Sequence, residues 1–208
     1  MSALPAPPIA IIADDEDLGR LLLAETAVAS GLAPLSFDNG VAALKAALSQ
    51  DVAIVLLDVD MPGMDGYAVC RRLRADPRFA TVPIVMVTGH EDSAAITRAF
   101  DAGATDFISK PVNWALLPRR LAYILRNAAA SERIERLAYF DTLTGLPNRQ
   151  RCIDAAERLF ADAAIAEEKV AVIYVDLNSF KRVNDTFGHT VGDAVLKSVA
   201  VRLARALA

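Results

Sequence analysis

The sequence predicts an α/β fold in which five short β-strands alternate with helices and pair into one parallel sheet. Two observations lead to this prediction. Short apolar runs recur along residues 1–112, and segments with helical spacing lie between them. In addition, the central run, Val52–Leu57, is apolar throughout, as expected for a strand that is buried on both faces of a parallel sheet.

The strands are expected in a regular order along the first half of the chain. A helical segment follows each strand, and Gly31 and Gly103 are suited to end two of these helices. Right-handed crossovers then favour a flavodoxin-like strand order, which places ligands beyond the carboxyl ends of the strands. The expected strands are Ile9–Ala13, Pro34–Phe37, Val52–Leu57, Ile84–Val87 and Thr105–Ile108, and the expected helices cover about 18–30, 39–48, 66–75 and 92–102.

The composition excludes several classes of protein. Of the 208 residues, 54% are hydrophobic and 23% are charged, which is too apolar for a disordered chain. The most apolar runs are too short to cross a bilayer, and the amino terminus lacks the basic segment of a secretory signal. Cys70 and Cys152 form neither a disulfide framework nor a metal-binding pattern, so we expect a cytoplasmic protein. Because the apolar runs are short, we also expect no membrane contact.

The charge distribution favours two units. Residues 1–112 carry 8 basic and 15 acidic side chains, whereas residues 113–208 carry 14 basic and 11 acidic side chains. The opposite signs fit two domains with different partners, although ordinary variation along a chain also produces such a difference.

A long helix is expected to join the two units. No glycine or proline interrupts residues 119–144, and Leu117, Leu121, Ile124 and Ala128 recur at helical spacing. We favour one continuous connector helix whose apolar stripe pairs with a second copy of the chain as a coiled coil. The alternative is a final helix that packs on the first domain and is followed by a short linker. The expected division is a first domain over 1–128, the connector over 114–140, and an incomplete second domain over 139–208.

Polar side chains follow several strands of the predicted sheet at one edge. Asp14 and Asp15 follow the first strand, and Asp58 ends the third. Thr88 ends the fourth strand and Lys110 follows the fifth. Singly, each residue is more often a helix cap or a solvated loop residue. Together, the converging carboxylates suit Mg2+, and the ammonium and hydroxyl groups beside them favour a site for phosphoryl transfer.

These residues resemble the receiver domain of two-component response regulators. The matching segments are IIADDE, LLDVDMPGMDG, VMVTG and DFISKP, and the resemblance covers roughly residues 8–128. It implies that Asp58 accepts a phosphoryl group from a sensor histidine kinase or a phosphotransfer protein. Asp15 and Asp58 would bind Mg2+ directly, together with the backbone carbonyl of Asp60. Asp14 would act through a metal-bound water.

The same resemblance assigns the remaining positions around the phosphoacceptor. Lys110 and Thr88 would contact the phosphoryl oxygens, and Phe107 occupies the position of an aromatic switch. His90, two residues after Thr88, stands where the family varies its dephosphorylation rate.

The second half of the chain carries another group of polar residues. Val170–Val175 is predicted to be a buried strand that leads to Asp176, where a carboxylate can face a cation. Phe180 offers an apolar wall, and Asn184 and Asp193 can pair with the polar edge of a ring. On these residues alone, a loop-rich polar patch is favoured over a nucleotide pocket. Helices are expected over about 149–163 and 193–208.

The segments AYFDTLTGLPNR and VDLNSFKRVNDTFGHTVGDAVL resemble the start of a GGDEF domain, the diguanylate cyclase module. The resemblance implies that Asp176 binds catalytic Mg2+ and that Asn184 and Asp193 recognise guanine, with Phe180 beside the nucleotide. Asn178 departs from the family pattern by replacing its second acidic residue. The family joins two GTP molecules into cyclic di-GMP across a dimer, so a homodimer is expected.

The GG[DE]EF loop that names this module does not occur in the 208 residues. We therefore expect a phosphoacceptor regulator whose cyclase output is truncated and inactive in this chain, with room for weak GTP binding. The alternative is a stand-alone receiver that serves as a phosphate sink or dimerisation partner. No DNA-binding output is expected, because residues 138–208 contain neither a helix-turn-helix pattern nor a basic recognition stripe.

Overall fold

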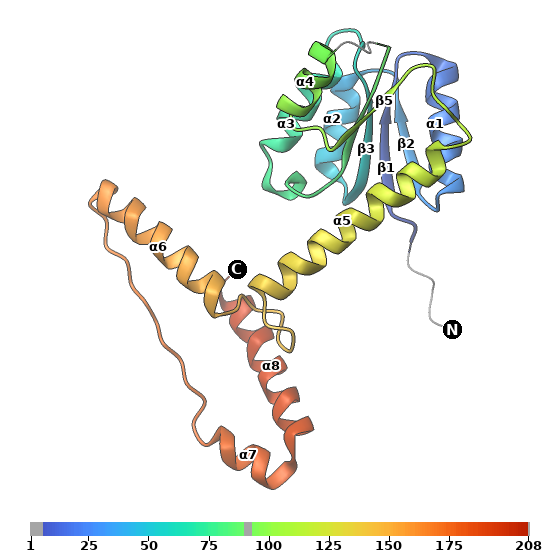
Figure 1. The fold of residues 1–208 in the computed structure, drawn as a ribbon. Helices are drawn as coiled ribbons and strands as arrows, with labels where there is room; N and C mark the ends of the chain where they lie inside the picture. Colours follow the sequence, from blue (N-terminus) through green and yellow to red (C-terminus); the bar gives the residue numbers. More distant parts are fainter. Residues whose placement is uncertain (1–5, 90–92, 208) are drawn as a thin grey trace. The chain divides into compact units, whose positions relative to one another are not determined.

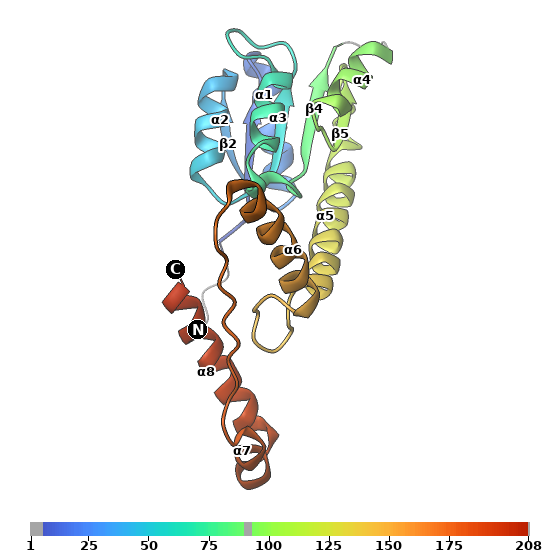
Figure 2. The same ribbon diagram turned by 90° about the vertical axis from the view of Figure 1, so that its left-hand side faces the viewer.

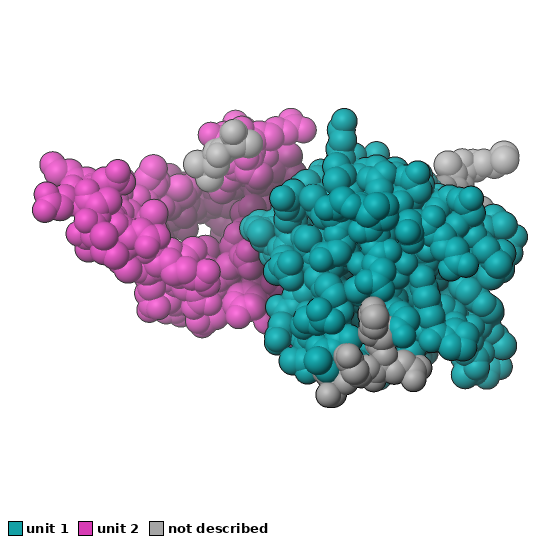
Figure 3. Space-filling model, turned by 90° about the horizontal axis from the view of Figure 1, so that it is seen from above, with its two compact units in different colours: residues 1–131 teal, residues 132–208 magenta. Residues whose placement is uncertain are grey.

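The chain forms two compact units, Met1–Ser131 and Glu132–Ala208, which Figure 3 shows in different colours. The structure, a computed structural model, describes residues 6–89 and 93–207. His90 and the expected helix start at residue 92 lie outside the described residues. Within the described part of the chain, no helix is both long enough and apolar enough to cross a membrane.

The first unit contains one five-stranded parallel sheet in the order β2-β1-β3-β4-β5 (Figure 1). This order confirms the flavodoxin-like prediction. In the register of β3 and β4, Asp58 pairs with Val87, so the two strands end at the same edge of the sheet. The strands are β1 Ile9–Ala13, β2 Ala33–Phe37, β3 Val52–Asp58, β4 Ile84–Thr88 and β5 Asp106–Ser109.

Helices cover both faces of this sheet (Figures 1 and 2). The β3 side chains of Ile54 and Leu56 pack on the face covered by α1 and α5, whereas Val55 and Leu57 pack toward α2, α3 and α4. Burial on both faces explains why this strand is apolar throughout. The helices are α1 Asp17–Ala29, α2 Gly40–Ser49, α3 Gly66–Arg74, the 3-10 turn η1 Pro77–Phe79, α4 Ser93–Asp101 and α5 Leu117–Tyr139.

The connection between α3 and β4 is held by two arginines with different surroundings. The half-buried Arg74 donates to the backbone carbonyls of Phe79, Val82 and Gly103, with N–O distances of 2.8 Å to Val82 and 2.7 Å to Gly103. The exposed Arg78 donates to both carboxylate oxygens of Asp76.

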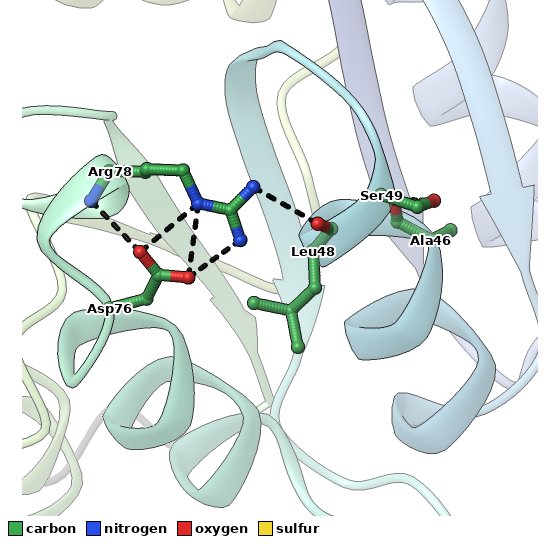
Figure 4. A network of polar contacts seen from close by, with 5 residues as sticks. All are labelled: Ala46, Leu48, Ser49, Asp76 and Arg78. Atoms are coloured by element: carbon green, nitrogen blue, oxygen red, sulfur yellow. Dashed lines mark hydrogen bonds and ion pairs between the residues drawn. The ribbon is translucent and has the colours of Figure 1, made fainter. Parts of the chain in front are cut away.

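Arg78 also reaches the carboxyl end of α2. Its Nη1 lies 3.1 Å from the carbonyl oxygen of Leu48, as Figure 4 shows. A guanidinium group is favourable here, because the last carbonyls of a helix carry partial negative charge. Hydrogen bonds from the side chain and the backbone of Arg78 lower the pKa of Asp76, so this pair stays ionised.

The two cysteines are expected to differ in reactivity. Cys70 lies fully buried in α3, and burial raises the pKa of its thiol to about 11. Cys152 is exposed. Because the thiolate is the reacting form, a thiol reagent should modify Cys152 quickly and leave Cys70 unmodified in the native chain. Peptide mapping after labelling, with and without denaturant, measures this difference. Fast native labelling of Cys70 would contradict it.

The apolar stripe of the connector helix divides into two parts. Helix α5 runs without interruption over Leu117–Tyr139, which lies within the range 114–140 predicted for one continuous connector helix. However, Leu117, Leu121 and Ile124 are buried in the core of the first unit, so the prediction that they pair with a second copy is wrong. They are buried because the first turns of α5 cover the sheet. The exposed apolar residues of α5 include Ile134 and Leu137, nearer its end.

A tight turn follows α5 at the start of the second unit. The Asn148 side chain donates to the Ala138 carbonyl at 2.7 Å and also accepts from the Arg151 backbone, which caps the next helix. Asp141 accepts from the backbone and hydroxyl of Thr144, and these bonds lower the pKa of its carboxyl. The Arg151 guanidinium lies over the Phe140 ring, 4.8 Å from its centroid.

The second unit contains the helices α6 Arg149–Ala166, α7 Phe180–Phe187 and α8 His189–Leu207. The predicted strand Val170–Val175 is wrong. These residues have no regular secondary structure, and Ile173 and Tyr174 are 84% and 95% exposed. A strand needs the backbone groups of a neighbouring strand, and the described residues of this unit contain none. Helix α7 was not predicted, although Phe180, Val183 and Phe187 follow helical spacing.

Candidate functional site

Three carboxylates meet at the carboxyl edge of the sheet. Asp14 and Asp15 follow β1, and Asp58 is the last residue of β3. One ligand oxygen from each lies within 4.8 Å of the others. Asp14 and Asp58 are buried, with 0% and 3% of their surface exposed, whereas Asp15 faces solvent. The structure thus brings together the three carboxylates that the sequence placed at this edge.

The surroundings of Asp14 fit a cation. Its Oδ1 accepts from the backbone N–H of Glu16 at 2.9 Å. Its Oδ2 is buried and accepts no hydrogen bond from the described residues, although it forms an ion pair with the Lys110 ammonium at 3.4 Å. A buried carboxylate oxygen without a hydrogen bond is unfavourable, and a hydrated divalent ion bound by the cluster would supply one. The residues present therefore fit Mg2+, with Asp15 supplying an exposed oxygen on the solvent side.

Lys110, which follows β5, joins this cluster. Its Nζ lies 3.0 Å from Asp58 Oδ2 and 3.4 Å from Asp14 Oδ2. Burial disfavours the charged ammonium, but the hydrogen bond and the charges of the two carboxylates outweigh burial and raise the pKa of Lys110. For Asp58 the balance is the opposite: burial dominates and raises the pKa of its carboxyl despite the contact with Lys110.

Thr88 and Phe107 lie on the two neighbouring strands. Thr88 ends β4 and is buried, and its carbonyl accepts from the Lys110 backbone at 2.7 Å. Phe107 on β5 is half-buried, and its ring meets that of Phe100 on α4 edge to face, with centroids 6.0 Å apart. Asp60 lies exposed in the loop after β3.

A cavity of about 210 Å3 adjoins the cluster, a feature that the sequence did not predict. Asp14 and Lys110 line it on the polar side, and Leu22 and Trp114 contribute to its mostly apolar wall. Gly19 of α1 also lines it. The sequence contains one sign of this feature, a glycine within a predicted helical segment. Glycine destabilises a helix, so its presence there indicates that another group lies close to the helix backbone.

Replacing Asp58 with asparagine is expected to stabilise the chain in the absence of metal. Burial raises the Asp58 pKa in the folded state. In the pH window between the pKa of the unfolded state and that of the folded state, the folded chain therefore holds a proton that the unfolded chain has released. Stability is then lost as the pH rises through this window. We expect Asp58→Asn to increase the free energy of unfolding by about 1 kcal/mol at pH 8, and by less near pH 4.

Denaturant unfolding of the two proteins over this pH range, in a chelating buffer, measures the effect. Asp51→Asn is the control, because it removes an exposed carboxylate that precedes β3. Equal stability of Asp58→Asn and the wild type at every pH would contradict the prediction. Adding Mg2+ should stabilise the wild type and remove the advantage of the variant.

The second group of predicted residues lies in the second unit. Asn184 on α7 packs against α8: a Cβ atom added at Gly192 would lie 1.8 Å from Asn184 Oδ1 and 3.4 Å from Phe180 Cζ. Phe180 and Asn184 are half-buried on α7, whereas Asp193 is exposed on α8. Asp176 is exposed in the segment without secondary structure, so no strand positions it.

Two family models match this chain, one in each of its compact units. The family model of the response regulator receiver domain matches residues 10–122. The model described as diguanylate cyclase, GGDEF domain, matches residues 138–208. A crystal structure of a putative response regulator from Chloroflexus aurantiacus is 32% identical, with a TM-score of 0.55. The alignment covers 58% of this chain and 98% of that one.

One curated relative extends the similarity beyond the first unit. Response regulator PleD of Caulobacter vibrioides is 28% identical over 160 residues, which are 74% of this chain and 35% of PleD. A cyclic di-GMP phosphodiesterase of Thermotoga maritima is 33% identical over 117 residues, 56% of this chain and 31% of that protein. The chain thus spans about a third of the length of these relatives. It belongs to the response regulator receiver family, and its residues 138–208 belong to the GGDEF domain.

Proposed function

We propose that Asp58 accepts a phosphoryl group from a sensor histidine kinase or phosphotransfer protein, and that this controls a diguanylate cyclase output. The observation that carries the proposal is the position of Lys110 Nζ, 3.0 Å from Asp58 Oδ2 at the edge of the carboxylate cluster. A carboxylate flanked by an ammonium can attack phosphorus while the charge that develops on the phosphoryl oxygens is neutralised.

Each neighbour has a part in this transfer. Asp15 and Asp58 would hold Mg2+ with the backbone carbonyl of Asp60, and Asp14 would orient a water on the metal. The metal would supply positive charge to the phosphoryl oxygens. Lys110 and Thr88 bind these oxygens after transfer. The half-buried Phe107 ring then turns inward as Thr88 moves, which gives a two-state element biased by one new charge.

The metal requirement gives the first test of this function. The chain is incubated with acetyl phosphate and Mg2+, and the phosphoryl group is detected by intact mass. Wild-type chain should gain one phosphoryl group with Mg2+ and none in excess chelator. Asp15→Ala should gain none, while Asp51→Ala, which also removes an exposed carboxylate, should behave as wild type. Full phosphorylation of Asp15→Ala would refute the metal site.

We also propose that residues 114–140 connect a receiver domain over 1–128 to a GGDEF segment over 139–208, and that the connector pairs with a second copy. The exposed Ile134 and Leu137 lie three residues apart on α5, on one side of the helix. Phosphorylation would shift the population of this dimer.

Charged substitutions on α5 test this pairing. Ile134→Glu combined with Leu137→Glu should leave the chain monomeric by light scattering, with or without beryllofluoride as a phosphoryl mimic. Ala129→Glu adds the same kind of charge away from these residues and should leave the dimer intact. A wild-type chain that is monomeric under both conditions would refute the pairing.

The output proposed for this family is the formation of cyclic di-GMP from two GTP molecules. Asp176 would contribute to a metal site there, and Phe180, Asn184 and Asp193 to binding of the guanine base. The 208 residues contain no GG[DE]EF sequence, so a polypeptide of these residues should bind GTP weakly and make no product. Chromatography after incubation of the phosphorylated chain with GTP and Mg2+ measures this, and cyclic di-GMP above a blank would contradict it.

A further inference from the structure

Gly19 stands at an unusual place for a glycine. It lies in the first turns of α1, where glycine is a poor helix former. The space that a side chain would need is already taken by Asp14. A Cβ atom built on Gly19 would lie 2.9 Å from Asp14 Oδ2 and 3.3 Å from both Cγ and Oδ1. Such an atom would press on the whole carboxylate group.

The Asp14 carboxylate is held from several sides. Glu16 N–H donates to Oδ1 at 2.9 Å, and Lys110 Nζ lies 3.4 Å from Oδ2. The side chain is fully buried. The orientation of the Asp14 carboxylate toward Asp15 and Asp58 therefore depends on the groups that pack against it, and Gly19 is one of them.

Helix α1 has little freedom to move away from this contact. Arg20 Nη1 donates to the Asp14 backbone carbonyl at 2.7 Å and ties the helix to the end of β1. Further along the same helix, Leu23 and Ala27 are fully buried in the core. A methyl group at position 19 would thus displace the Asp14 carboxylate, which is a terminal group, rather than the helix.

We propose that Gly19 is a positioning residue for the metal site, because its missing side chain lets α1 close directly on the Asp14 carboxylate. This inference rests on the proposed function, in which Asp14 orients a water on the metal. A displaced Asp14 can no longer hold that water in the geometry that Mg2+ requires, so metal affinity should fall.

Gly19→Ala tests the inference, because its two effects have opposite signs. Alanine favours the helix, so the melting temperature of the metal-free chain should be unchanged or higher. The dissociation constant for Mg2+ should rise about tenfold. The titration is followed by the fluorescence of Trp114, the single tryptophan, which lines the cavity beside Asp14. Gly89→Ala is the matched control, because nothing lies within 4 Å of a Cβ atom there.

A double-mutant cycle shows whether Gly19 acts through Asp14. In an Asp14→Ala background, Gly19→Ala should have no further effect on Mg2+ affinity, because the displaced group is gone. An equal loss in both backgrounds would overturn the inference. So would unchanged affinity in Gly19→Ala, or a Gly19→Ala chain that fails to fold, since the carboxylate would then not be the group that yields. A wild-type chain that binds no Mg2+ would overturn the proposed function itself, and this inference with it.

Discussion

Replacing Asp58 with asparagine should abolish phosphorylation of the chain. Asp58 is 3% exposed, ends the central strand, and has Lys110 Nζ 3.0 Å from its Oδ2. Its carboxylate oxygen would attack the phosphorus of acetyl phosphate, and the bond from phosphorus to the acetate oxygen would break. An amide oxygen is a far weaker nucleophile, and the other carboxylates of the cluster are assigned to the metal.

Intact mass after incubation with acetyl phosphate and Mg2+ measures the effect. The wild type should carry one phosphoryl group and Asp58→Asn none, which is a complete loss of signal. Asp51→Asn controls for the loss of a carboxylate outside the cluster and should be labelled as the wild type is. Undiminished labelling of Asp58→Asn would show that another residue is the acceptor.

The second large effect is expected for the stability of the first unit. Arg74→Ala should lower the free energy of unfolding by about 2–4 kcal/mol. The guanidinium donates to the carbonyls of Phe79, Val82 and Gly103 and to the hydroxyl of Thr105. Removing it leaves the three carbonyls without this donor in a half-buried place where the turn η1 and the connection from α4 to β5 meet, whereas the Thr105 hydroxyl still accepts from the Ile84 N–H.

Chemical denaturation of the variants measures this loss. Arg74→Lys should recover little of it, because an ammonium cannot match the planar fork of the guanidinium. Arg78→Ala is the matched control, because Arg78 lies four residues away and makes its contacts with Asp76 and Leu48 at the surface. Its effect should be small, as for most exposed ion pairs. Equal effects of the two alanine substitutions would contradict the prediction.

Helix α5 has a buried beginning and an exposed end, and both matter for how a signal would reach the second unit. The buried Leu117, Leu121 and Ile124 make the beginning of the helix part of the first unit, whereas Ile134 and Leu137 are exposed near its end. A change in the packing of the first unit would therefore act directly on the connector. In the proposed function, pairing of this exposed part would control the output.

The first unit and its site were largely predictable from the sequence. Alternating apolar runs and helical segments favour a parallel sheet, because central strands such as β3 and β4 bury both faces and each crossover is right-handed. The carboxyl ends of parallel strands share an edge, so the positions of Asp14, Asp58 and Lys110 after their strands were sufficient to place them together. In the structure, Lys110 Nζ lies 3.0 Å from Asp58 Oδ2 and 3.4 Å from Asp14 Oδ2.

Only the tertiary structure decided what depends on neighbours far apart in the chain. The spacing of Leu117, Leu121 and Ile124 is the same for a coiled coil and for a helix packed on a sheet, and burial in the core selected the second. Val170–Val175 has the composition of a strand but no partner strand among the described residues, so it forms no strand. The approach of Gly19 to Asp14 is likewise a matter of packing distance. Local pattern specifies which elements a chain can form, and contact between elements specifies which surfaces they bury.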